Sequence, residues 1–232
     1  MKKLNLFLVI LLSASLVFTG CDALNNTAKG AIIGTGAGAA VGAGIGGLIG
    51  KDGKSAAVGA AIGGVVGATA GAIIGKKMDK AAAEAAAVEN AKVETIEDVN
   101  GLKAVKVTFD SGILFDFNKT ALKSDAKTAL AKFATVLVEN PTMDIAVYGH
   151  TDNVGTLAAN QKVSLGRASK VADYLVAQGA TRTQMKVVEG RDYSMPVASN
   201  ETAEGRAQNR RVEVYMYASE KMIQDAQNEA TN

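Results

Sequence analysis

Glycine recurs at every fourth position in two adjacent segments of this chain. The first series occupies positions 30, 34, 38, 42, 46 and 50, the second positions 59, 63, 67, 71 and 75, and Lys51 to Lys54 separate them as a turn. A period of four places the glycines near one stripe of a helix, where a neighbouring helix can approach backbone to backbone. The pattern therefore predicts an α-helical glycine-zipper hairpin over residues 30–77.

The surroundings of this hairpin follow from its composition. Each uncharged stretch of about 20 residues would extend roughly 30 Å as a helix, which matches the hydrocarbon core of a bilayer. In water, each interior glycine costs about 1 kcal/mol relative to alanine. Insertion into a bilayer or zipper-driven homo-oligomerisation fits both facts, and a flexible low-complexity spacer is the alternative.

The beginning of the chain has the features of an export signal. Lys2 and Lys3 precede an apolar stretch that runs from Leu4 to Phe18, and Cys21, which follows Thr19-Gly20, is the only cysteine. This ending resembles a lipobox, in which the thiol is diacylated and becomes the new N-terminus. Two acyl chains, at about 0.8 kcal/mol per buried methylene, give stable anchoring to membrane lipid. An ordinary buried free thiol is the alternative for Cys21.

The glycine bias ends before residue 78, and the sequence then changes character. Met78 to Lys92 is rich in alanine and charge, which fits a helical linker. Two strand-like runs follow, Val93 to Asp98 and Leu102 to Phe109, and Asn100-Gly101 between them is a two-residue hairpin signal.

Apolar residues at helical spacing then predict two helices. The first carries Leu122, Ala126, Leu130, Phe133 and Leu137, and the second carries Leu165, Ala168, Ala172 and Leu175. Asn140-Pro141 should end the first helix and Gly179 the second. Strands are predicted over Met143–Gly149, Met185–Gly190 and Arg211–Met216. The resulting order, ββαβαββ, describes an α+β domain with a mixed sheet packed on helices.

Polar motifs are scattered through this domain at fixed spacings. They are Phe115-Asp116-Phe117-Asn118, Gly149-His150-Thr151-Asp152-Asn153-Val154-Gly155, Asn160, Ser164, Arg167, Glu204-Gly205-Arg206 and Asn209-Arg210-Arg211-Val212-Glu213. Together they closely resemble the OmpA-like, peptidoglycan-associated domain over about residues 102 to 217. Val163 departs from the leucine that the family usually has before the serine, which should affect only packing. With the signal peptide and glycine zippers, the whole chain resembles lipoproteins of the YiaD type.

The resemblance implies a ligand and a binding site. The family binds meso-diaminopimelate of the peptidoglycan stem peptide, whose free end carries an ammonium and a carboxylate. An aspartate suits the ammonium, and the planar fork of an arginine suits the carboxylate. The resemblance assigns Asp152 and Arg167 as this pair, with polar support from Thr151, Asn118, Asn160 and Arg210. The alternative is that Asp152 and Arg167 bridge each other as an exposed ion pair, worth about 0 to 1 kcal/mol.

Other classes of function are disfavoured. A formal charge of +2 is too small to argue for nucleic acid. His150 is the only histidine, so neither a metal site nor another cofactor is expected, and His150 reads as an oriented loop residue. A wall hydrolase would need a metal, a nucleophile with its base or two opposed carboxylates, of which only the last remains open. Arg206, Asn209 and Glu213 are expected to be structural.

The sequence therefore predicts a non-enzymatic tether between a membrane and peptidoglycan. A glycine-zipper oligomer or pore, with wall binding as a secondary anchor, is the alternative. The outer membrane is the family expectation, with the C-terminal domain in the periplasm, although Asp22 next to the acylated cysteine would favour inner-membrane retention in enterobacteria. The predicted parts are a signal peptide (1–20), a lipidated tether (21–29), the zipper hairpin (30–77), a helical linker (78–92), the OmpA-like domain (93–218) and a C-terminal tail (219–232).

Overall fold

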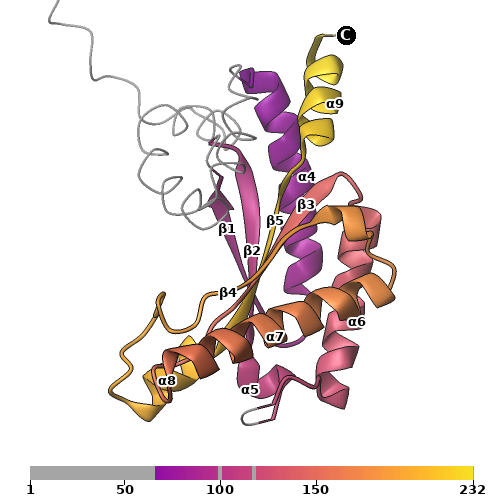
Figure 1. Ribbon diagram of the computed structural model, residues 1–232. Coiled ribbons are helices and arrows are strands. Elements are labelled where there is room, and N and C mark those ends of the chain that lie inside the picture. The colour runs from indigo at the N-terminus through magenta and orange to yellow at the C-terminus, as the bar shows by residue number, and fades with distance from the viewer. Residues whose placement is uncertain (1–65, 99–100, 117–118, 232) are drawn as a thin grey trace, which may run out of the picture.

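In the computed structural model of this chain, the described residues are 66–98, 101–116 and 119–231 (Figure 1). The predicted signal peptide, the lipid anchor at Cys21, the zipper hairpin as far as residue 65 and the site residue Asn118 lie outside these ranges.

The described residues form a five-stranded mixed sheet. Its strands are β1 (Ala91–Glu97), β2 (Lys103–Asp110), β3 (Met143–Gly149), β4 (Met185–Gly190) and β5 (Arg211–Ala218). They lie in the order β1-β2-β5-β3-β4, in which only β3 and β4 run parallel. The last strand in sequence is thus central in space, which explains why nearly all of its residues are buried. The α+β class and the ββαβαββ order predicted from the sequence are confirmed.

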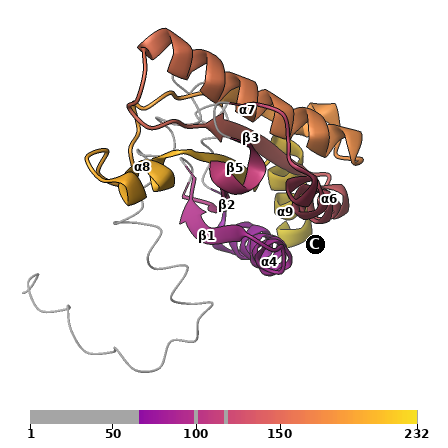
Figure 2. The ribbon, with the colours of Figure 1, turned by 90° about the horizontal axis from the view of Figure 1, so that it is seen from below.

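The helices are α4 (Ala68–Ala86), α5 (Ser111–Leu114), α6 (Ser124–Glu139), α7 (Leu157–Ala177), the 3-10 turn η1 (Arg182–Gln184), α8 (Ala203–Asn209) and α9 (Glu220–Thr231). Helices α4, α6, α7 and α9 cover one side of this sheet, whereas α8 lies at the lower end of the molecule in Figure 1 (Figures 1 and 2). The main core lies between this side of the sheet and helices α4, α6, α7 and α9. Phe109 of β2 and Phe133 of α6 meet edge to face at its centre, with ring centroids 5.7 Å apart.

The two predicted helical faces are only partly right. Leu122 lies before α6 and pairs with Phe115 in an isolated bridge. Leu165 of α7 is 48% exposed, whereas Val171 is fully buried. The face of α7 that turns inward is the one that also carries Asn160, Ser164 and Arg167. The apolar residues alone therefore gave a face rotated away from the observed one, because polar residues share the buried side.

Helix α4 crosses the boundary predicted between residues 77 and 78. Ile74, Met78, Ala81 and Ala85 are fully buried at spacings of three and four, so one continuous face packs on β1, β2 and α9. The helix ends at Ala86, and residues 91 and 92 already belong to β1. The segment predicted as a helical linker is therefore part of the folded core, because its apolar stripe continues the one that begins at Ala70.

The segment predicted as a C-terminal tail is also ordered. Helix α9 buries Met222, Ile223 and Ala226, and it lies beside α4 at the upper end of the molecule in Figure 1. The two helices come from opposite ends of the described chain, so their contact joins segments that are far apart in sequence.

None of the helices in the described ranges combines the length and apolar character that crossing a membrane requires. The predicted zipper hairpin lies mostly before residue 66, so its insertion stays a prediction.

Packing of α4 makes a testable prediction for the full-length chain. Ile74→Ala should lower the free energy of unfolding by about 2–5 kcal/mol, because it opens a cavity in a fully buried position. Lys76→Ala, at an exposed position of the same helix, should change it by less than about 0.5 kcal/mol. Urea unfolding followed by circular dichroism measures both values. Equal effects of the two substitutions would show that α4 does not belong to the core.

Candidate functional site

The candidate site lies where β3 and β4, the parallel pair, end at the same edge of the sheet. Helix α7 crosses this edge at very short range. A side chain at Gly149 would meet the backbone oxygen of Ser164 at 2.0 Å, and one at Gly190 would meet the backbone nitrogen of Leu165 at 2.4 Å. Only glycine permits this approach. The two glycines thus fix α7, and the polar residues on its inner face, against the strand ends.

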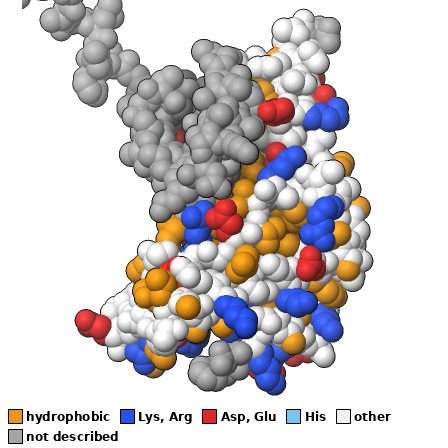
Figure 3. All heavy atoms as spheres, viewed as in Figure 1, with side chains coloured by type: hydrophobic (Ala, Val, Ile, Leu, Met, Phe, Trp, Pro, Cys, Tyr) orange, Lys and Arg blue, Asp and Glu red, His pale blue; other side chains and the backbone are white. Residues whose placement is uncertain are grey.

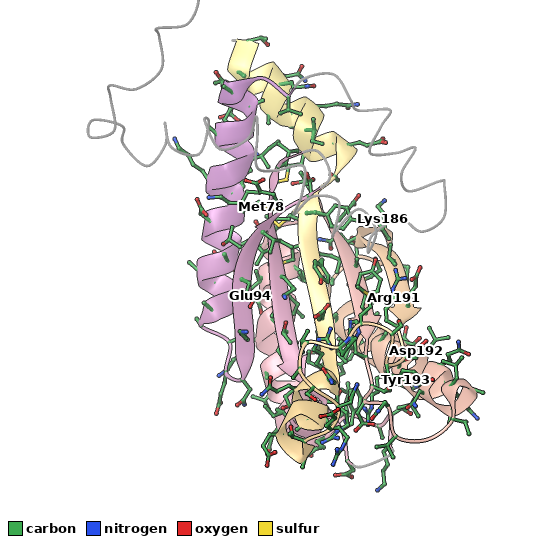
Figure 4. The ribbon with its side chains drawn as sticks, turned by 90° about the vertical axis from the view of Figure 1, so that its left-hand side faces the viewer. Met78, Glu94, Lys186, Arg191, Asp192 and Tyr193 are labelled. Atoms are coloured by element: carbon green, nitrogen blue, oxygen red, sulfur yellow. The ribbon has the colours of Figure 1, made fainter. Side chains whose placement is uncertain are left out.

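Hydrogen bonds join the loops that leave these strands. His150 N donates to Arg211 O (2.9 Å), and Thr151 N donates to Asp192 O (2.8 Å). Asp192 has a positive φ of 42°, and its backbone N donates to Ser164 Oγ (3.2 Å). Figure 4 shows Arg191, Asp192 and Tyr193 following one another at the end of β4. The loop after β3, the loop after β4 and α7 therefore form one connected frame.

Asp152 is held in this frame by two kinds of donor. Its Oδ2 accepts from Arg210 Nη1 at 2.5 Å, and its Oδ1 accepts from Val154 N at 3.1 Å. The Asp152 side chain is 11% exposed and that of Arg210 is 33% exposed. Asp152 therefore pairs with Arg210, which the sequence placed only in a supporting role.

Arg167 is buried and bonded differently. Its Nε donates to Lys119 O at 3.2 Å, and its guanidinium lies over the Phe115 ring, 5.3 Å from the centroid. Burial lowers the pKa of Arg167 below its usual value, Arg210 lowers it further, and Asp152 opposes the shift. Within the described ranges, no carboxylate forms an ion pair with Arg167. The alternative interpretation, an exposed ion pair between Asp152 and Arg167, is therefore wrong, because Asp152 pairs with Arg210 instead.

The other two described residues assigned to the site, Thr151 and Asn160, differ in their contacts. Thr151 is buried, and its hydroxyl oxygen has no hydrogen-bond partner among the described residues. Asn160 is also buried, and its amide donates to Val154 O (3.0 Å), which secures the loop that follows Asp152. Asp152, Arg210, Arg167 and Thr151 are thus brought to one place, whereas Asn160 holds the loop beside them.

Sequence reasoning missed two contributors. Phe115 stacks on the Arg167 guanidinium, and its place in the Phe115-Asp116-Phe117-Asn118 motif was the only signal available. The backbone oxygen of Asp192 accepts a hydrogen bond from the backbone N of Thr151. Asp192 itself lies in the left-handed backbone region, which aspartate tolerates. No sequence motif marked Asp192, because its role comes from a backbone carbonyl.

A buried charged cluster supports the site from β5. Glu213 Oε1 accepts from Arg211 Nε (2.8 Å), and Glu213 Oε2 accepts from Tyr215 Oη (2.8 Å) and lies 3.3 Å from His150 Nε2. Burial by itself would raise the pKa of Glu213, but His150 and Arg211 hold it well below its usual value. Burial lowers the pKa of His150, although Glu213 opposes this shift. The cluster fixes the start of β5, the strand that directly follows Arg210.

Asn209 and Arg206 hold the long loop between β4 and α8. Asn209 Oδ1 accepts from the backbone N of Val197 (2.8 Å) and Ala198 (3.0 Å), and Asn209 Nδ2 donates to Ala198 O (2.8 Å). Arg206 Nη1 donates to Asn200 O at 2.8 Å. These contacts agree with the structural roles predicted for Arg206 and Asn209.

The described residues contain no group of three or more histidine, cysteine, aspartate or glutamate side chains that could hold a metal ion. The donor set of the site itself, one carboxylate beside two guanidinium groups, suits a charged organic ligand better than a cation.

The geometry and the comparisons agree on the class of protein. Residues 114–210 match the model of the OmpA family and form an OmpA-family domain, and residues 1–79 match the YMGG-like Gly-zipper model. The resemblance predicted from the motifs is thereby confirmed.

Individual proteins extend this result. Outer membrane protein A of Bordetella avium is 41% identical over 118 residues, which cover 51% of this chain and 60% of that protein. Probable lipoprotein YiaD of Escherichia coli K12 is 38% identical over 104 residues, 45% of this chain and 47% of YiaD. The solved structure of the cell wall anchor of the T6SS from Pseudomonas aeruginosa is 31% identical to this chain, with a TM-score of 0.51. The match covers 61% of this chain and 97% of the anchor chain. The chain thus spans less than two thirds of these two curated relatives.

Glu213 gives a prediction with a defined pH dependence. Glu213→Gln leaves Arg211 buried without its charge partner and should destabilise the protein by about 3–5 kcal/mol at neutral pH. Because the folded pKa lies below the ordinary value of 4.5, this contribution is present above that value and is lost as the pH falls further. The difference between wild type and variant should therefore shrink below about pH 4.5. Urea unfolding at several pH values measures it, and a constant difference down to acid pH would contradict this role of Glu213.

Proposed function

We propose that the OmpA-family domain binds peptidoglycan non-covalently, through the free end of diaminopimelate in the stem peptide. In this proposal Asp152 accepts hydrogen bonds from the ligand ammonium, and Arg167 donates to the ligand carboxylate. Thr151 and Arg210 line the same place, and Asn118 and Asn160 support it. The protein would then act as an envelope tether rather than as an enzyme.

The observation that carries the proposal is that Arg167 is buried and has no carboxylate partner among the described residues. A buried guanidinium costs free energy unless an anion compensates it. Arg210 adds repulsion, and the nearby carboxylate of Asp152 is already bonded to Arg210. A ligand carboxylate would supply the missing anion, and a guanidinium can bind it through two parallel charge-assisted bonds.

The other half of the ligand also finds suitable partners. Each carboxylate oxygen of Asp152 has capacity for a further hydrogen bond beyond those from Arg210 and Val154. The buried hydroxyl of Thr151 can accept or donate beside it. A zwitterion needs one anion and one cation at a fixed separation, and Asp152 and Arg167 are fixed on separate elements of one frame. A simple anion or a simple cation would use only half of this arrangement.

The names of the relatives support a location in the envelope and attachment to the cell wall. One is named an outer membrane protein, another a probable lipoprotein, and the structural neighbour a cell wall anchor. In the proposed arrangement the lipid on Cys21 holds the chain in the outer membrane and the OmpA-family domain reaches the wall from the periplasmic side. Asp22 leaves retention in the inner membrane as the alternative.

Arg167→Met separates function from stability. The variant should lose about 1 to 3 kcal/mol of binding to isolated wall that contains diaminopimelate, because the ligand carboxylate loses its charged donor. Its free energy of unfolding should stay the same or rise, because a buried cation without a described carboxylate partner is replaced by an apolar chain. Co-sedimentation with wall sacculi and urea unfolding of the full-length protein in detergent measure the two quantities.

Two further variants frame this test. Asp152→Asn should weaken retention to a similar degree, whereas Arg182→Met, which removes only a surface ion pair with Asp173, should leave retention unchanged. Full retention of both Arg167→Met and Asp152→Asn would rule out the assigned site. Release of soluble muropeptides by the wild-type protein would contradict the non-enzymatic part of the proposal.

Cys21→Ser tests the anchor. Without the thiol no diacyl group can be attached, so the protein should move from the membrane fraction to the soluble fraction, and labelled palmitate should no longer be incorporated. Fractionation of cells that express either form measures this. If the variant stays in the membrane, another part of the chain provides the anchor.

A further inference from the structure

Exposed apolar side chains gather around the candidate site. Among the described residues six large hydrophobic side chains are exposed, and four of them lie in or directly after the two loops that leave β3 and β4. These four, which we name the apolar rim, are Val154 (62% exposed), Leu157 (47%), Met195 (37%) and Val197 (56%). Figure 3 shows hydrophobic side chains at the lower left of the molecule, over the end where Figure 1 places α8 and the start of α7.

The apolar rim is continuous with the charged residues on both sides. On one side, the backbone N of Val154 donates directly to Asp152 Oδ1. On the other side, the residues next to Arg210 hold the second loop, because Asn209 accepts from Val197 N and Arg211 donates to Met195 O (3.1 Å). Both loops that carry the apolar rim are therefore bonded either to Asp152 or to a neighbour of Arg210.

The loops that carry the apolar rim are fixed by their hydrogen bonds. Thr156 caps α7 by accepting from Ala159 N (3.3 Å), and Asn160 holds Val154 O. The second loop is bonded to Asn209 and Arg206 at several backbone positions. Side chains on such well-held loops are presented to solvent by the fold itself, and a group of them marks a contact surface.

The chemistry of the ligand decides what this surface contacts. Behind its zwitterionic tip, diaminopimelate continues as a short chain of methylene groups, and in a stem peptide it is followed directly by D-alanine. One extended residue spans about 3.3–3.6 Å. A stem peptide held by its charged tip would therefore carry the alanine methyl beyond the charged residues, where the surrounding loops present the apolar rim.

We infer that the apolar rim is a second part of the binding site, which takes the methyl group of the D-alanine that adjoins diaminopimelate in the stem peptide. This inference rests on the proposed function and adds specificity to it. The charged residues recognise the tip, and the apolar rim distinguishes a diaminopimelate that is built into a stem peptide from the free amino acid.

Isothermal titration of the full-length protein in detergent tests the inference with two probes, free meso-diaminopimelate and the tetrapeptide L-Ala-D-Glu-meso-diaminopimelate-D-Ala. The double variant Val154→Thr and Val197→Thr keeps the side-chain shape and both backbone contacts but replaces one methyl on each side with a hydroxyl. Wild type should bind the tetrapeptide more tightly than the free amino acid. The double variant should reduce the ratio of the two affinities about three- to tenfold, as expected for the loss of one or two apolar contacts.

A matched control and a third probe define the opposite results. Val138→Thr makes the same change at an exposed position of α6 outside the two loops and should leave the ratio unchanged. An unchanged ratio in the double variant would overturn the inference, as would an equal loss for both ligands. It would also be overturned if the double variant altered only binding of the wall disaccharide without peptide, or only the oligomeric state in sedimentation. If wild type binds neither free meso-diaminopimelate nor the tetrapeptide, the proposed function itself fails.

Discussion

A guanidinium group buried without a carboxylate partner among the described residues is the constraint around which this domain is organised. Arg167 is fixed by a backbone oxygen and an aromatic ring, neither of which neutralises its charge. Arg210 faces the same region and is already neutralised by Asp152. Such an arrangement stores an electrostatic cost in the free protein, which an anion bound at Arg167 would remove. Binding sites commonly carry this kind of unfavourable preorganisation.

The rest of the fold keeps these charges in place. Gly149 and Gly190 let α7 approach the strand ends closely enough for its polar face to become an inner wall. The cluster around Glu213 fixes β5, and β5 lies beside β3, so that Arg210, just before β5, meets Asp152 in the loop that follows β3. Helices α4 and α9 close the opposite end of the core. The domain thus separates a stabilising end, rich in apolar contacts, from an end where charged groups and loops meet.

The sequence predicted the order of strands and helices because each element carries its own periodicity. It placed β3 and β4 at the residues where they are found, since both are short apolar runs between clear helix ends. It failed for α4 and α9, which pack against each other although more than one hundred residues separate them along the chain. A linker and a tail were therefore predicted where the structure has two packed helices.

The residues that the sequence assigned to the site lie together in the structure, although their pairing was not predicted, and their binding of a ligand stays a prediction. Family motifs pointed to Asp152, Arg167, Thr151 and Arg210, which the structure brings together. The partner of Asp152 depends on which strand lies next to β3, and this neighbour is β5, the last strand in the sequence. Leu165 was misjudged because a buried polar stripe rotates α7 away from the orientation that its apolar residues favour. The second difference arises because buried polar residues of α7 override its hydrophobic pattern.

The most direct measurement is a crystal structure of the protein with a diaminopimelate-containing stem peptide bound. The account predicts the ligand carboxylate on the terminal nitrogens of Arg167 and the ligand ammonium within hydrogen-bonding distance of Asp152. A ligand seated elsewhere, with the Arg167 guanidinium touching no anion, would contradict it.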